Sequence, residues 1–284
     1  MQNEKAIGVF DSGVGGLTVL HALQSALPSE RFIYLGDTAR VPYGTRSPET
    51  IVRYSNRVAG HLYKRDIKAL VIACNTATSY ALDSLQKAFR PLGIPVFGVI
   101  EPSATTALKH SSNKCILVLG TEGTIRGNKY TETIHNISPT ATVHGLACPL
   151  FVPLIEEGWH QHPVTETVAK EYFGTVEKLT SFDTAILGCT HYPLLKPVLS
   201  KLFPNIQFID SAATTAAMVK TELTKQNLIS SRVQKDSEVD TEFLVTDNLQ
   251  RFCKVGYYFV GSSPSPLHMV DLTDSDEQIV ANLL

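Results

Sequence analysis

The sequence predicts an α/β fold of two similar three-layer α/β/α domains, each with a mostly parallel sheet. Two pairs of similar strings carry this prediction. LVIACNTAT (residues 70–78) and AILGCTHYP (185–193) each run from a short apolar segment through a cysteine into a helical pattern. VFDSGVGG (9–16) and VLGTEGTI (118–125) each read as strand, small-residue turn and helix start. The second copies follow the first by 115 and 109 residues, which indicates an internal duplication related by pseudo-symmetry.

The length, composition and net charge of the chain agree with a two-domain protein and limit its partners. A chain of 284 residues suggests two domains or one large α/β unit, and 43% hydrophobic residues can fill a sizeable core. A net charge of −2 without a block of like charges argues against nucleic acid or anionic membrane as the main partner. We expect no signal peptide and a cytoplasmic location, because the chain enters a strand pattern almost at once.

The cysteines read as free thiols in a reducing compartment. Their number is odd, their spacing is wide, and they have no CxxC pair, which argues against both disulfides and a structural zinc site. We therefore expect no metal. The five are Cys74, Cys115, Cys148, Cys189 and Cys253.

The first strand is expected at residues 6–10, followed by the turn DSGVGG and a helix with leucines up to Leu27. The turn lacks the GxGxxG order and the lysine of a P-loop, which argues against a nucleotide site. Asp11 stands at the carboxyl end of the strand, where open α/β sheets bind ligands. The turn either only allows tight packing or faces a ligand, and the residues leave both interpretations open.

A second strand at residues 32–36 leads to Asp37 and then to a loop in which Pro42 and Gly44 flank Tyr43. The loop is either an ordinary turn or one that presents backbone N–H groups to a ligand carboxylate. A helix at 47–64, the first cysteine strand at 70–73, a helix at 76–89 and a strand at 95–99 follow. Glu101 and Pro102 then interrupt the pattern, and we place a domain crossing there.

The second half repeats this order with a strand at 116–119, a turn containing Thr121, and a strand at 142–146. The proline-broken segment 148–158 ends in Glu156 and Glu157, for which a solvated turn is favoured over a carboxylate in a cleft. A helix at 163–179, the second cysteine strand and a helix at 197–203 follow. The chain then has a strand at 206–210, a helix to 223, a surface loop at 227–241, a strand at 243–246, a helix at 248–259 and an edge strand at 269–272.

Cys74 and Cys189 both end strands, precede helix starts and carry polar neighbours, Asn75 and Thr76 in one case and Thr190 and His191 in the other. A lone buried cysteine is usually structural, but packing does not explain polar residues repeated at both places. Disulfide exchange favours CxxC, and a Cys–His nucleophile would leave Cys74 unexplained. Proton transfer on both faces of one carbon uses both thiols, inverts a stereocentre and needs no cofactor.

On this interpretation the neighbouring residues have roles in binding and proton transfer. Asp11 and His191 would tune Cys74 and Cys189 respectively. The carboxylate and ammonium of an amino acid would be bound by Ser12, Asn75, Thr76 and Thr190. Negative charge that develops on the α-carbon must be stabilised by preorganised donors.

Five strings occur in this order, DSGVGG, GDTARVPYG, ACNTAT, PLFVPLIEEG and GCTHYP, and the resemblance that they carry runs from about residue 7 to about residue 272. The chain thereby resembles the glutamate racemases of the aspartate/glutamate racemase superfamily. The resemblance implies a two-domain α/β fold with the active site in the interdomain cleft, and domains of residues 1–97 plus 210–284 and of residues 98–209. It also implies cofactor-independent interconversion of L- and D-glutamate by Cys74 and Cys189, supplying D-glutamate for peptidoglycan, with Cys74 acting on D-glutamate and Cys189 on L-glutamate.

The resemblance further implies a set of site residues. Asp37 and Glu157 would be auxiliary acids, with the choice between Glu156 and Glu157 open. The expected substrate contacts are Asp11, Ser12, Tyr43, Gly44, Asn75, Thr76, Thr121, Thr190 and His191. A homodimer and activation by a peptidoglycan precursor stay open. So do the alternatives of aspartate, hydantoin or malonate chemistry, and a racemase-fold protein that inhibits DNA gyrase.

Overall fold

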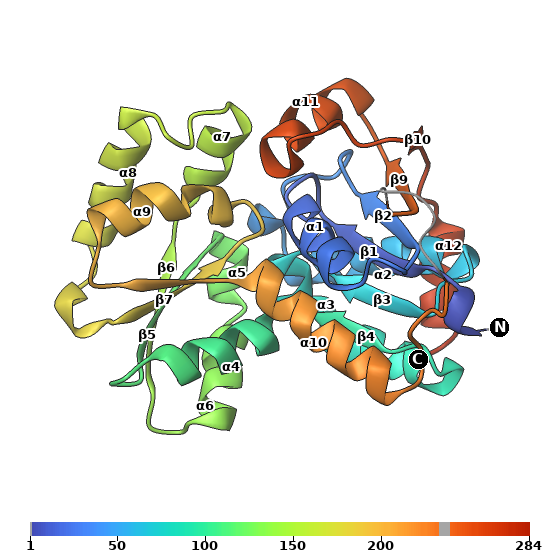
Figure 1. Cartoon of the computed structure of the whole chain (residues 1–284), viewed down its shortest axis with the longest axis horizontal. Helices are drawn as coiled ribbons and strands as arrows, with labels where there is room; N and C mark the ends of the chain where they lie inside the picture. The colour runs from blue at the N-terminus through green and yellow to red at the C-terminus, as the bar shows by residue number, and fades with distance from the viewer. Residues whose placement is uncertain (1, 233–238) are drawn as a thin grey trace.

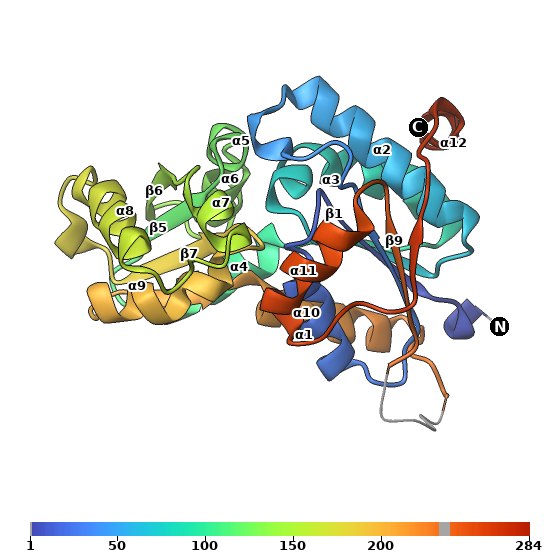
Figure 2. The same ribbon diagram turned by 90° about the horizontal axis from the view of Figure 1, so that it is seen from above.

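The computed structural model describes residues 2–232 and 239–284, so the middle of the expected 227–241 loop lies outside the described residues. The chain forms two lobes, each built on one parallel sheet (Figure 1). The first lobe holds both chain ends, and the second holds the middle of the chain (Figure 2).

The first lobe has a six-stranded sheet in which every recorded strand pairing is parallel. In spatial order its strands are β10 (Leu267–Met269), β9 (Thr241–Val245), β2 (Phe32–Gly36), β1 (Ile7–Asp11), β3 (Ala69–Ile72) and β4 (Val96–Gly98).

The second lobe has a four-stranded parallel sheet. Its order is β6 (Thr142–Ala147), β5 (Cys115–Gly120), β7 (Thr184–Gly188) and β8 (Gln207–Asp210). The order β6-β5-β7-β8 repeats the order β2-β1-β3-β4 of the first lobe, and both cysteine segments follow the third strand of their unit. The topology therefore repeats as the paired strings predicted.

Helices cover both faces of the first sheet, because alternate side chains of its strands point to opposite sides. Ile7 and Val9 pack on one side and Phe10 on the other. One face is covered by α1 (Leu17–Ala26), α10 (Ser211–Lys225) and α11 (Leu249–Val260). The other is covered by α2 (Pro48–Lys64), α3 (Asn75–Phe89) and α12 (Asp274–Ala281).

The second sheet is also a middle layer. One core cluster joins it to α7 (Phe151–Glu156), α8 (Pro163–Gly174) and α9 (Lys196–Leu202), and another joins it to α4 (Ile100–His110) and α6 (Lys129–Ile137). The short helix α5 (Glu122–Arg126) follows β5. Single 3-10 turns cover Gln2–Glu4, Tyr43–Thr45, Arg90–Leu92, Leu179–Ser181 and Tyr192–Leu195. The predicted fold class of two three-layer α/β domains is confirmed.

Several element predictions were wrong. Glu101 and Pro102 do not interrupt the chain but lie in the first turn of α4, where a proline's missing N–H has no helical partner to lose. Helix α12 and the short helix α7 were not predicted, and α8 ends at Gly174 rather than at residue 179. Helix α7 tolerates Pro153 because that proline also falls in the first turn.

The lobes join where β4 leads into α4 and where β8 leads into α10. The domain limits expected at residues 97/98 and 209/210 fall inside these two strands and remain our proposal for the division of the chain. Across residues 2–232 and 239–284, no helix is both long and apolar enough to span a bilayer.

Candidate active site

Both cysteines line one cavity between the lobes. Its volume is about 60 Å³, and side chains from both lobes line it. Most of the lining residues follow the carboxyl ends of the central strands, namely β1, β3, β5 and β7. The lining residues are Ser12, Gly13, Val41, Pro42, Tyr43, Gly44, Cys74, Asn75, Thr76, Thr121, Thr124, Val152, Glu156, Gly188, Cys189, Thr190 and His191.

Cys74 caps the N-terminus of α3, since its Sγ accepts a hydrogen bond from the backbone N–H of Ala77 at 3.4 Å. The same sulfur lies 3.6 Å from Oγ of Ser12. Burial, and then the nearby carboxylate of Asp11, raise the pKa of Cys74 to about 12. Cys74 is therefore a protonated thiol at neutral pH and is ready to donate a proton.

Cys189 has a cationic neighbour. Its Sγ lies 3.9 Å from Nδ1 of His191, and Nε2 of the same ring lies 3.1 Å from Oε1 of Glu156. Burial opposes the charged ring, but the interactions with Cys189 and Glu156 outweigh it and raise the pKa of His191 to about 10. An imidazolium thus lies beside Cys189, whereas a carboxylate lies near Cys74, so the charged surroundings of the two thiols differ although their positions in the fold match.

Asp11 lies beside the lining, while the next residues, Ser12 and Gly13, line the cavity. Its Oδ2 accepts a hydrogen bond from the N–H of Gly13 at 3.0 Å, and its Oδ1 is buried without a hydrogen-bond partner among the described residues. Burial raises the pKa of Asp11, and the His191 charge offsets part of this rise. A carboxylate held so close to Cys74 can adjust proton transfer at that thiol.

A cluster of hydroxyl groups joins the lobes at the cavity wall. Oγ1 of Thr76 lies 2.9 Å from Oγ1 of Thr121 and 3.0 Å from Oγ1 of Thr124. On the other side, the hydroxyl of Thr18 donates to the carbonyl of Thr190 at 3.1 Å. Thr124 was not predicted, although its position three residues after Thr121, which caps α5, is the usual spacing of a helix cap.

The loop with Tyr43 and Gly44 also reaches the cavity, and Asp37 holds it from behind. Oδ2 of Asp37 accepts from the Tyr43 hydroxyl at 2.7 Å. Its Oδ1 accepts from Arg40 at 2.7 Å and from the Thr246 hydroxyl at 2.9 Å. Asp37 is fully buried and does not line the cavity, so its contacts are those of a residue that positions Tyr43.

The neighbouring acids Glu156 and Glu157 lie in different surroundings. Glu156 lines the cavity, contacts His191 and accepts from Arg251 at 2.9 Å, so the solvated turn favoured for it was wrong. Glu157 ends outside the cavity lining with a side chain 57% exposed, 3.6 Å from Arg251. The structure thus brings Glu156, the last residue of α7, to His191, whereas Glu157, just after the helix, stays exposed.

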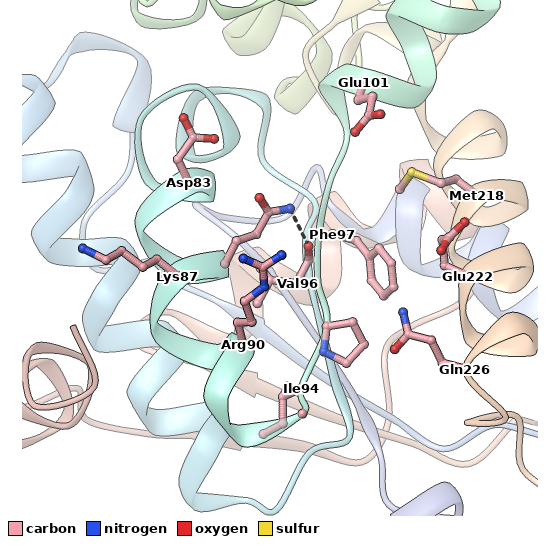
Figure 3. A pocket seen from close by; sticks show the side chains of 13 residues that line it. Asp83, Lys87, Arg90, Ile94, Val96, Phe97, Glu101, Met218, Glu222 and Gln226 are labelled. Carbon is pink, nitrogen blue, oxygen red and sulfur yellow. Dashed lines mark hydrogen bonds between the residues drawn. The ribbon is translucent and has the colours of Figure 1, made fainter.

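A larger groove of about 810 Å³ lies elsewhere, between α3, the edge strand β4 and α10 (Figure 3). Side chains of both charges line it, including Lys87, Arg90 and Glu222, and the Gln86 amide donates to the carbonyl of Val96. Neither cysteine reaches it, so size alone does not mark the reactive site. Within the described part of the chain, no group of three or more His, Cys, Asp or Glu side chains could hold a metal ion.

The chain matches a known family model and is similar to proteins of known function. Residues 7–219 match the family model described as Asp/Glu/Hydantoin racemase. The chain is 46% identical to a curated glutamate racemase of Geobacter metallireducens over 96% of this chain and 99% of that protein. It resembles a crystal structure of glutamate racemase from Francisella tularensis in complex with D-glutamate, with a TM-score of 0.87, 35% identity and coverage of 96% and 99%.

A third similar protein is Escherichia coli glutamate racemase, crystallised with L-glutamate and the activator UDP-MurNAc-ala. Its TM-score is 0.74, with 25% identity over 95% of this chain and 99% of that one. These relatives match this chain over nearly their whole lengths, so the likeness extends over both lobes.

Proposed function

We propose, because this chain belongs to the Asp/Glu/Hydantoin racemase family, that it interconverts L- and D-glutamate with two cysteines as acid and base. One observation carries the proposal: Cys74 and Cys189 follow matched strands of the two lobes and line one cavity. The enzyme is thus an amino-acid racemase, an isomerase. We propose that it needs neither pyridoxal phosphate nor a metal, because the two thiols supply both proton-transfer groups.

In the direction from L-glutamate, the Cys189 thiolate removes the α-proton, and the C–H electron pair stays on the substrate as a carbanion. Cys74 then gives its proton to the opposite face of the same carbon. The product is D-glutamate, Cys189 is now a thiol and Cys74 a thiolate, and the reverse reaction starts from this state. The raised pKa of Cys74 supports a proton on that thiol at the start. The imidazolium of His191 lies beside Cys189, where it can stabilise negative charge on the sulfur.

The carbanion needs donors that are already in place, because charge develops on a weakly acidic carbon. Hydroxyl groups from both lobes can supply them, namely those of Ser12, Thr76, Thr121 and Thr190, while the amide of Asn75 can bind a substrate carboxylate. Asp11 and His191 act beside Cys74 and Cys189, Glu156 keeps His191 charged, and Asp37 positions Tyr43. We propose that Glu157 has no part in proton transfer, since its side chain is exposed.

The relatives favour glutamate over aspartate, hydantoin or malonate as the substrate, because all three named above are glutamate racemases. The same likeness favours racemisation over a gyrase-inhibiting role as the function of this chain. We further propose that it works in the cytoplasm and supplies D-glutamate for peptidoglycan, the role expected of a glutamate racemase. A homodimer and activation by a peptidoglycan precursor stay predictions for this chain, and adding UDP-MurNAc-ala to the assay tests the second.

Circular dichroism of L-glutamate incubated with the protein, without added cofactor, tests the activity: the signal should decay to zero. Cys74→Ser and Cys189→Ser should each slow racemisation in both directions by about 10²–10⁴-fold. In D₂O, Cys74→Ser should still exchange the α-proton of L-glutamate without inverting it, because Cys189 remains. Full racemisation by either variant would contradict the two-base mechanism, and a constant signal with the parent protein would contradict the activity itself.

A further inference from the structure

Tyr130, which lies outside the cavity lining, contacts a residue that lines it. Its hydroxyl lies 2.7 Å from Oδ1 of Asn75. Both side chains are buried, with Tyr130 3% and Asn75 2% exposed. Tyr130 belongs to α6 of the second lobe and Asn75 to the first turn of α3 in the first lobe, so this contact crosses the cleft between the lobes.

The contact fixes the orientation of the Asn75 amide. Burial raises the pKa of the Tyr130 hydroxyl well above its ordinary value, so the group keeps its proton. A buried hydroxyl proton needs an acceptor, and Oδ1 of Asn75 supplies one. The amide is planar, so fixing its oxygen toward Tyr130 turns its NH₂ group the other way.

That NH₂ group is a donor without an acceptor. Nδ2 of Asn75 is buried and has no hydrogen-bond partner among residues 2–232 and 239–284. Asn75 lines the cavity that holds both cysteines. An unsatisfied buried donor is costly, and a bound group that only accepts hydrogen bonds removes this cost. A carboxylate is such a group, and glutamate carries two.

We propose that Tyr130 is a positioning residue for substrate binding: it holds the Asn75 amide so that Nδ2 donates to a substrate carboxylate in the cavity. This inference rests on the proposed function for the identity of the substrate. Because Tyr130 comes from one lobe and Asn75 from the other, the donor has its binding orientation only when the lobes are closed as in this structure.

Tyr130→Phe tests the inference, because it removes the hydroxyl and keeps the ring. The ring packs closely on Gly188, where an added Cβ would lie 3.1 Å from Cε2 of Tyr130. We expect KM for both enantiomers to rise about tenfold with kcat within about threefold, because the lost contact acts alike on bound substrate and transition state. Tyr80→Phe is the matched control: its hydroxyl also crosses the lobes, donating to the Gly123 carbonyl at 3.0 Å, but does not touch Asn75. We expect its KM to stay within twofold.

A double mutant separates positioning from a general structural effect. In an Asn75→Ala background, Tyr130→Phe should raise KM no further, because the amide through which it acts is gone. An unchanged KM in Tyr130→Phe, or the same rise in the Asn75→Ala background, would overturn the inference. A crystal structure of the unaltered protein with D-glutamate gives a readout that needs no variant: an Asn75 Nδ2 that does not contact a carboxylate oxygen also overturns it.

Failure of the proposed function is distinguishable from failure of this inference. If the parent protein does not racemise glutamate, the proposed function fails. If the parent racemises glutamate and Tyr130→Phe does so with the parent's KM, the role of Tyr130 alone fails.

Discussion

His191 lies between Glu156 and Cys189, with Nε2 3.1 Å from Oε1 of Glu156 and Nδ1 3.9 Å from Sγ of Cys189. Glu156 lies on α7, and His191 comes just after β7, so two segments 35 residues apart combine into one proton-transfer group. The arrangement leaves one thiol beside a cation and the other, Cys74, beside the carboxylate of Asp11.

Glu156→Gln should move the alkaline limb of the pH profile of kcat/KM to lower pH. His191 is held charged up to a pKa of about 10 against burial, in part by the Glu156 carboxylate. Without that carboxylate the imidazolium is less favoured, its pKa falls, and it loses its proton at a lower pH. We also expect kcat/KM at neutral pH to fall about 10²-fold.

Glu157→Gln is the matched control for this prediction, because it makes the same change of a carboxylate to an amide in the neighbouring acid. Its side chain is exposed and does not contact His191, so both the pH profile and kcat/KM should stay as in the parent. A shifted limb in Glu157→Gln, with none in Glu156→Gln, would reverse the roles of the two acids.

Gly15→Ala should slow racemisation by about 10²-fold. A Cβ at this position would lie 2.3 Å from Nδ1 of His191 and 2.4 Å from Oγ1 of Thr190, closer than real contacts allow. Either group must move, and a misplacement of about 1 Å near reacting groups costs on the order of 10²-fold in rate. Steady-state racemisation measures the loss.

Gly174→Ala controls for replacing a glycine by alanine, because a Cβ there meets nothing within 4 Å. Gly174 ends helix α8, where alanine is favoured over glycine by up to about 1 kcal/mol. Activity should be unchanged and the thermal midpoint equal or slightly higher. Equal activity of the two alanine variants would show that the close approach of Gly15 to His191 is not needed.

Asp37→Asn should destabilise the fold and raise KM without changing the shape of the pH profile. Asp37 accepts hydrogen bonds from Tyr43, Arg40 and Thr246, and an amide cannot accept from all three. Breaking a buried charge pair costs on the order of 3 kcal/mol, which urea unfolding can measure. A stable variant with a lost pH limb would instead support the auxiliary-acid role expected from the family.

Lys68→Met should destabilise the protein without changing the turnover of folded molecules. Lys68 is fully buried, contacts the Glu30 carboxylate and donates to the Asn3 carbonyl at 2.6 Å. Neither Lys68 nor Glu30 lines the cavity, and removal of one partner of a buried pair costs about 3–5 kcal/mol.

Lys68→Met with Glu30→Gln should recover more than half of that loss, because no unpaired buried charge remains and the Ser230 N–H keeps an oxygen acceptor. Unfolding free energies of the two single variants and the double variant measure this recovery. An additive loss would show that Lys68 and Glu30 stabilise the fold independently of each other.

Much of the fold could be predicted from the sequence, because strand and helix patterns are local. The strand at Phe32–Gly36 has the predicted bounds, and the two cysteine strings occupy matched places in the two sheets. Predictions failed where local signals conflict. Glu101 and Pro102 looked like an interruption, although a proline in the first turn of a helix is tolerated.

The site residues, too, divide into those that local patterns predict and those that depend on the tertiary structure. Strand ends are readable from local pattern, so Asp11, Cys74 and Cys189 could be named from the residues themselves, whereas Thr121 was named only from the family resemblance. The choice between Glu156 and Glu157 could not be made from sequence, because it depends on which side chain contacts His191, a residue 35 positions beyond Glu156.

The sequence by itself determined a duplicated α/β chain with one cysteine at the end of a matched strand in each half. Only the tertiary structure decided that the thiols differ in their charged surroundings. It also decided that Tyr130 contacts Asn75 across the lobes. The physical reason is that hydrogen bonds, burial and charge depend on distances between segments far apart in the chain, which residue patterns do not contain.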